Sequence, residues 1–134
     1  MLATNAAGRE LLVSVKSRSR GRDYAIGSSF NKYPADIYAF VDMTDGAPAT
    51  VCLAGAKTVV ELAMARHSQY QSDRGRPAEV LGSWSPKLSG GLLEAMGARE
   101  AWDLLDNPAP TTWPAVTAEL LSYARGNAAK RRGT

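Results

Sequence analysis

A lysine near the end of a short strand-like stretch is the side chain in this sequence best suited to chemistry on a phosphate. Lys16 lies in the run Val13-Ser14-Val15-Lys16-Ser17-Arg18, in which apolar and polar residues alternate. If this run is a strand, Ser14, Lys16 and Arg18 share one face, because successive side chains point to opposite sides. The ammonium group of Lys16 would then favour a phosphate or a developing hydroxide beside it. The alternative is a lysine at a strand end whose ammonium group reaches into solvent.

Two hairpins are predicted to position this lysine. In the first, residues 2–4 and 9–17 are strands joined by a turn at 5–8. In the second, the strands 37–43 and 50–53 flank a turn at 45–48. The nearly continuous apolar character of residues 37–43 predicts burial on both faces of that strand. The residues of the first hairpin that are predicted to point into the core are Leu11, Val13 and Val15.

Helices are predicted to follow the second hairpin. Residues 57–71 carry apolar side chains at helical spacing, and residues 92–105 are predicted to form one or two short helices. A last helix is predicted to start near Thr112, with Pro114 in its first turn, and to end at about Ala124. The expected fold class is therefore α/β or α+β, with a small mixed sheet built from two hairpins and flanked by helices.

Length and composition restrict the class of protein. The 134 residues fit one domain, predicted to span residues 1–125 and to be followed by a basic, mobile tail at 126–134. The sole cysteine, Cys52, excludes a disulfide within the chain and a zinc site with several cysteines, and it favours a cytoplasmic location. No apolar run reaches the roughly 18–20 residues that a membrane-spanning helix needs, so no membrane partner is expected.

The charge is concentrated at the two ends of the chain. Residues 1–32 hold six Lys or Arg side chains against Glu10 and Asp23, and residues 125–134 hold four basic residues and no acid. Residues 33–124 hold eleven acidic and six basic side chains, and the whole chain carries +3. Basic ends on an acidic body suggest a polyanionic partner, for which nucleic acid is the commonest choice. The alternative is an ordinary solvated surface with a ragged tail.

The first hairpin also carries a resemblance to a known family. A second strand that ends in acid-x-Lys, often followed by Ser/Thr-Arg, is typical of the PD-(D/E)XK nuclease superfamily. Residues 3–18 are similar to the core of archaeal Holliday-junction resolvases and of a group of bacterial nuclease-like proteins. The strand Tyr38-Ala39-Phe40-Val41-Asp42 and the run Trp102-Asp103-Leu104-Leu105 resemble later parts of that bacterial group, so the resemblance covers about residues 2–105.

The resemblance implies a restriction-endonuclease-like fold and a Mg²⁺-dependent reaction. In the family, an aspartate on the first strand and an acid two residues before the lysine hold the Mg²⁺, which activates water for attack on a phosphodiester. Here Ser14 stands at the acid position, and the first-strand aspartate is missing, which leaves Lys16. Asp42, on the neighbouring strand, is the candidate replacement ligand. The helix that precedes the first strand in the family is also missing, which would uncover one sheet face, so a homodimer is expected.

These observations lead to a hypothesis for function. The chain is expected to be a nuclease-like DNA-binding protein whose metal site is incomplete, with Lys16 and Ser14 at the catalytic positions and weak or no phosphodiester hydrolysis. If the site were completed, the chain would be a Mg²⁺-dependent endodeoxyribonuclease. The alternative is a non-catalytic protein–protein interaction module that keeps the fold. The residues expected to contact DNA phosphates are Arg18, Arg20, Arg22 and Lys32.

Overall fold

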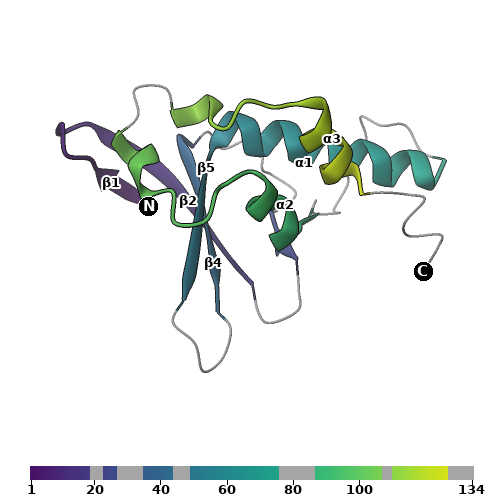
Figure 1. Ribbon diagram of the computed structural model, residues 1–134, viewed down its shortest axis with the longest axis horizontal. Coiled ribbons are helices and arrows are strands. Elements are labelled where there is room, and N and C mark those ends of the chain that lie inside the picture. The colour runs from purple at the N-terminus through teal and green to yellow at the C-terminus, as the bar shows by residue number, and fades with distance from the viewer. Residues whose placement is uncertain (19–22, 27–34, 44–48, 76–86, 107–109, 127–134) are drawn as a thin grey trace.

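The computed structural model describes residues 1–18, 23–26, 35–43, 49–75, 87–106 and 110–126 (Figure 1). Residues 127–134, which make up nearly all of the expected tail, lie outside the described residues. In chain order the elements are β1 (Leu2–Thr4), β2 (Glu10–Arg18), β3 (Tyr24–Ala25), β4 (Ile37–Asp42), β5 (Thr50–Gly55), α1 (Ala56–Asp73), β6 (Lys87–Leu88), α2 (Gly90–Ala95), the 3-10 helices η1 (Trp102–Asp106) and η2 (Pro110–Thr112), and α3 (Ala118–Arg125).

The main sheet is mixed and has the strand order β1-β2-β4-β5. Strands β1 and β2 pair antiparallel, as do β4 and β5, so both predicted hairpins are confirmed. Strands β2 and β4 pair parallel, and this pairing joins the two hairpins into one sheet. The chain between them carries β3, which forms a second, two-stranded sheet with β6. The predicted fold class, a mixed sheet flanked by helices, is confirmed.

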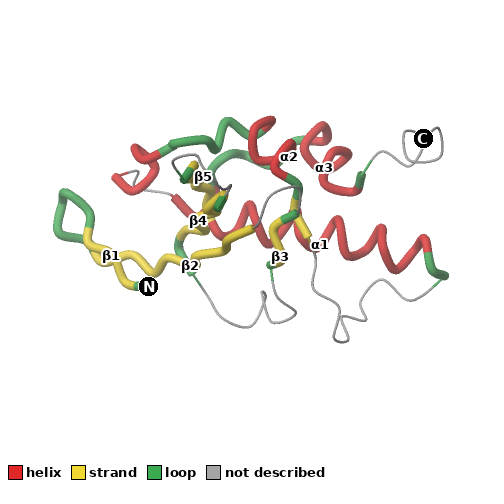
Figure 2. The backbone as a smooth tube through the Cα atoms, turned by 90° about the horizontal axis from the view of Figure 1, so that it is seen from below, coloured by secondary structure: helices red, strands yellow, loops and turns green. Residues whose placement is uncertain are grey.

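Both faces of strand β4 are buried, as its apolar sequence predicts. Tyr38 and Phe40 point to one face, where they join a core with Val59 and Leu62 of helix α1. The residues of the opposite face form a second cluster, whose buried members are Leu11, Val13, Ile37, Ala39, Leu53, Ala101 and Leu104. The sheet is therefore the middle layer of the molecule. Figures 1 and 2 show the β1–β2 hairpin projecting at one end and the long helix α1 extending toward the other.

Val15 corrects one core prediction. Its side chain is 48% exposed, whereas Leu11 and Val13 on the same face of β2 are 1% and 3% exposed. The cluster that covers this face, with Ala101 and Leu104 packed on the sheet, includes Leu11 and Val13 but not Val15. Strand alternation predicts to which face the Val15 side chain points. It does not predict whether other residues cover that face, and burial depends on such a cover.

The start of the last helix is a second correction. The helix predicted to begin near Thr112 begins at Ala118. The carbonyl oxygens of Trp113 and Pro114 accept hydrogen bonds from the Gly55 amide at 2.6 Å and the Thr58 hydroxyl at 2.8 Å, so they attach this segment to the junction of β5 and α1. Thr117 caps the helix instead, because its hydroxyl oxygen accepts from the Leu120 amide at 3.2 Å.

Candidate functional site

Strand β2 places the predicted site residues on one face of the sheet. In the parallel register with β4, Ser14 lies beside Tyr38, Lys16 beside Phe40 and Arg18 beside Asp42. Ser14, Lys16 and Arg18 are all half-buried, and they face away from the cluster that contains Leu11 and Val13. The predicted separation of a polar face from an apolar face is thus present along this part of β2.

Lys16 stands among apolar neighbours rather than acids. Its register partner Phe40 is fully buried, and Cys52 follows on the next strand, opposite Phe40. Within the described part of the chain, the Lys16 side chain forms no hydrogen bond or ion pair. With no acidic partner among the described residues, this ammonium group can interact with an external anion.

Arg18 interacts with other side chains of the protein. Its Nη2 donates to Oδ2 of Asp42 at 3.0 Å, and the two side chains are only 22% and 23% exposed. The guanidinium carbon lies 4.7 Å from the centre of the Tyr24 ring, which places Arg18 between β4 and β3. Burial is the largest single influence on Arg18 and acts to lower its pKa. The hydrogen bond to Asp42 and the negative charges nearby together outweigh burial, so the pKa is raised. Arg18 therefore fixes local structure in addition to any contact with a ligand.

Asp42 lies on the same face as Lys16, on the adjacent strand, as the sequence predicts. Its carboxylate is already bonded to Arg18, however. The described residues contain no group of three or more His, Cys, Asp or Glu side chains that could hold a metal ion. Asp42 shares its carboxylate with Arg18, Ser14 offers a neutral hydroxyl, and Glu94, a second carboxylate near Asp42, is paired as well. Such donors are a poor set for a hard cation such as Mg²⁺. The metal role of Asp42 stays a prediction from the sequence.

A small cavity of about 170 Å³ lies beside the Arg18–Asp42 pair. Tyr24, Cys52, Glu94 and Arg99 are among the residues that line it. Burial raises the pKa of the Cys52 thiol, so the thiol stays neutral at physiological pH. Glu94 and Arg99 form a longer, largely exposed ion pair at 3.8 Å. With two acids and two arginines around it, this cavity carries no net charge that would select a phosphate.

The sequence did not predict the surroundings of this cavity. Tyr24 belongs to β3, Cys52 to β5 and Glu94 to α2, and these elements are brought together by the packing of the second sheet and helices on the first. The spacing of Tyr24, Cys52 and Glu94 in the sequence does not predict that they line the same cavity. Of the other predicted phosphate-binding residues, Arg20, Arg22 and Lys32 lie outside the described residues.

Comparisons with protein families, with curated proteins and with solved structures give no match for this chain. Among the described residues, no helix has the length and apolar character that crossing a membrane requires.

Proposed function

We propose that this protein binds DNA through its phosphate backbone and that it is a nuclease-like fold with weak or no cleavage activity. The observation that carries the proposal is the position of Lys16, which β2 holds half-buried beside Phe40 without an acidic partner among the described residues. Asp42 offsets the charge of Arg18 and leaves the charge of Lys16 intact.

The sequence around Lys16 adds further positive charge. Arg20 and Arg22 follow strand β2 directly, and Lys32 belongs to the same connection to β4. A protein that neutralises several phosphates releases the cations bound to DNA, so its affinity falls steeply as salt rises. The contacts proposed here are with phosphates and not with base edges, so we expect little dependence on DNA sequence.

Cleavage is expected to be weak because Lys16 has no acidic partner among the described residues. Ser14 supplies no negative charge at the position where the resembling family has an acid, and Asp42 is bonded to Arg18. Metal-assisted hydrolysis of a phosphodiester depends on carboxylates that hold the cation. These residues therefore favour DNA binding without cleavage over DNA cleavage.

The test is fluorescence anisotropy with labelled duplex and branched DNA at about 50 mM and about 200 mM salt. Mg²⁺ is added in parallel, and the products are separated on a gel. We expect salt-sensitive binding without cleavage. Cleavage would show that Asp42, or a partner chain, completes a metal site.

Charge-matched variants distinguish the loss of a proposed phosphate contact from the loss of the same positive charge elsewhere on the protein. Lys16→Ala is compared with Lys57→Ala, and Arg20→Ala/Arg22→Ala with Lys57→Ala/Arg74→Ala. Lys57 and Arg74 are exposed and lie at the two ends of helix α1. Loss of each phosphate contact should lower the salt slope by about 0.9, which the control variants should not do. Equal effects of both sets, or no binding at low salt, would remove the DNA proposal.

One observation favours the second candidate function, a protein-interaction module that includes self-association. Val15 is 48% exposed on the sheet face opposite Lys16, next to the half-buried Val41 of β4, and Met43 beyond them is 58% exposed. An apolar interface does not weaken with salt as a phosphate contact does. Light scattering over a range of concentrations, with Val15→Asp as the variant, tests whether a second copy covers this face. A monomer at every concentration would remove the homodimer.

A further inference from the structure

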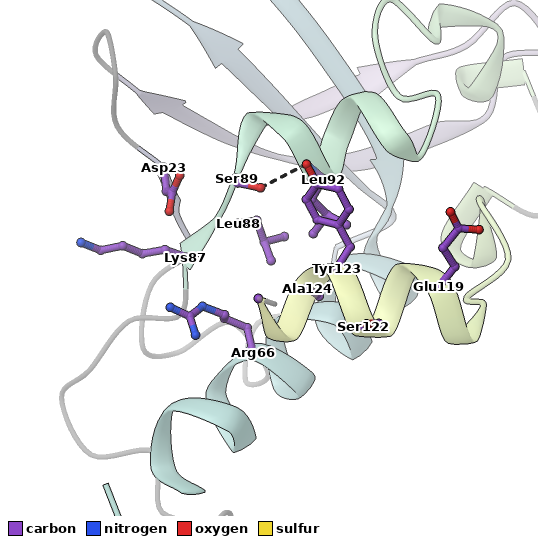
Figure 3. Close-up of a pocket in the computed structure, with 11 residues that line it drawn as sticks. Asp23, Arg66, Lys87, Leu88, Ser89, Leu92, Glu119, Ser122, Tyr123 and Ala124 are labelled. Atoms are coloured by element: carbon purple, nitrogen blue, oxygen red, sulfur yellow. Dashed lines mark hydrogen bonds between the residues drawn. The ribbon is translucent and has the colours of Figure 1, made fainter. Parts of the chain in front are cut away.

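A larger cavity, of about 470 Å³, lies between helices α1, α2 and α3 and strand β6 (Figure 3). Its described lining does not include Lys16, Arg18 or Asp42. This volume falls in the range of roughly 300–1,000 Å³ that sites for small molecules occupy. The cavity is therefore a candidate site that the DNA proposal does not use.

The floor of the cavity is apolar and one wall is aromatic. Leu88 and Leu92, each 1% exposed, lie at its base. Tyr123 of α3 also lines it and is 48% exposed. The Tyr123 hydroxyl rests against Gly91 of α2, where even a methyl group would overlap it. The hydroxyl end of the ring thus lies against α2, and the exposed part of the ring offers a surface on which a flat body can stack.

The described charged residues of the cavity lie at its two ends. Figure 3 shows Arg66 of α1 and Lys87 of β6 on one side, together with Asp23, and Glu119 of α3 at the other end. Among the described lining residues, the first side therefore holds two cations and one acid. Within the described part of the chain, the Lys87 side chain forms no hydrogen bond or ion pair. A guanidinium and an ammonium suit the oxygens of a phosphate or carboxylate, and Glu119 suits a hydrogen-bond donor.

We propose that this cavity binds a small organic phosphate with a flat body that ends in a hydrogen-bond donor, which is the chemistry of a nucleotide whose base carries an amino group. A cytidine monophosphate unit is the smallest nucleotide of this kind and is the probe. The phosphate lies against Arg66 and Lys87, and the base stacks on Tyr123 above the floor of Leu88 and Leu92. The amino group of the base donates to Glu119, as carboxylates accept from the cytosine amino group in DNA recognition. Such a unit exists both as a free nucleotide and at the end of a DNA strand.

Calorimetric titration with CMP, UMP and cytidine tests the three contacts separately. CMP and UMP have nearly the same size but differ in the donor or acceptor that would face Glu119. We expect a CMP dissociation constant between about 10 μM and about 1 mM. UMP should bind at least about threefold more weakly, and cytidine, which has no phosphate, at least about tenfold more weakly.

Variants connect each contact to its residue. Lys87→Ala should weaken CMP binding about fivefold or more, and Lys57→Ala, outside the cavity, should not. Tyr123→Leu should weaken CMP binding by a similar factor. Gly91→Ala should do the same without removing the ring, because the added methyl group displaces Tyr123. Glu119→Ala should remove the preference for CMP over UMP. Thermal unfolding of each variant confirms that it is folded.

Two results would overturn the proposal. One is the absence of CMP binding at about 5 mM. The other is CMP binding that Lys87→Ala and Tyr123→Leu leave unchanged. In either case the cavity is not a nucleotide site.

Oligonucleotides distinguish the two sources of the ligand. A single strand with a 5′-phosphorylated cytidine should compete with CMP if the cavity takes a strand end, and the same strand without the phosphate should compete less. If CMP binds and neither oligonucleotide competes with it, the site binds free nucleotides and not strand ends. The proposal does not rest on DNA binding by Lys16, because Lys16→Ala should leave CMP binding unchanged even if it abolishes binding to the duplex.

Discussion

Arg18 and Asp42 face each other across the parallel strands β2 and β4, and Nη2 of Arg18 donates a hydrogen bond of 3.0 Å to Oδ2 of Asp42. The Met43 amide also donates to the Arg18 carbonyl oxygen at 3.1 Å, so side chain and backbone join the strands at the same point. Tyr24 stacks against the guanidinium from β3. This pair therefore links both sheets at the end of the parallel pairing.

The first prediction concerns the stability of this pair. Arg18→Ala should lower the free energy of unfolding by about 1–3 kcal/mol, because it leaves a mostly buried carboxylate without its partner. Arg18→Ala/Asp42→Asn should recover part of that loss, since no uncompensated charge remains. Urea unfolding of the parent, both single variants and the double variant gives the coupling free energy. Additive losses in the double variant would show that the pair does not act as a unit.

The second prediction concerns Gly90, the first residue of helix α2. A Cβ atom there would lie 2.5 Å from Nη1 and 2.8 Å from Nη2 of Arg18, so Gly90→Ala must displace the guanidinium from its position. We expect a loss of about 1–2 kcal/mol in the parent. In the Arg18→Ala background the space is open, and alanine should be neutral or stabilising by up to about 1 kcal/mol, because it is the better helix residue. Urea unfolding would contradict this account if Gly90→Ala cost the same in both backgrounds.

The third prediction compares two valines of strand β2. Val13 is 3% exposed and Val15 is 48% exposed, although both point to the same face of the sheet. Val13→Ala should cost about 2 kcal/mol of unfolding free energy, whereas Val15→Ala should cost less than about 0.5 kcal/mol. Equal losses, measured by urea unfolding at low protein concentration, would mean that Val15 is covered in solution. A loss at Val15 that grows with concentration would point to a second copy as the cover.

The two valines also show how far the sequence could predict this structure. Alternation along β2 predicts which residues share a face, and it correctly separates Leu11 and Val13 from Lys16. It cannot predict where the covering layer stops, because η1 supplies that layer from about 90 residues later in the chain. The predicted elements depend on local patterns, and these patterns located both hairpins and helix α1.

The Arg18–Asp42 pair could not be predicted in the same way. The two residues are 24 positions apart, and they meet only because the register of the parallel strands sets Arg18 beside Asp42. The sequence placed Asp42 on a neighbouring strand but had no signal for this register. The cavity of about 470 Å³ is a stronger case, because four separate elements line it.

The last prediction concerns alkaline pH. Burial raises the pKa of the Cys52 thiol above its ordinary value of 9.0, and burial also raises the pKa of Tyr38 above 10.0. The unfolded chain then loses these protons at a lower pH than the folded chain does. Between the unfolded and folded pKa values the folded state binds more protons, so the free energy of unfolding falls as pH rises. The loss should begin near pH 9 with Cys52, and Tyr38 should add to it above about pH 10.

Cys52→Ala isolates the thiol from every other group that titrates in this range. The variant should lose some stability at neutral pH, because Cys52 is 6% exposed in the core. Its unfolding free energy should nevertheless fall less steeply than that of the parent between about pH 8 and about pH 10. Tyr38→Phe should change the slope only above that range. Urea unfolding at several pH values measures both slopes, and parallel curves for the parent and Cys52→Ala would show that the thiol ionises as readily in the folded protein as in the unfolded chain.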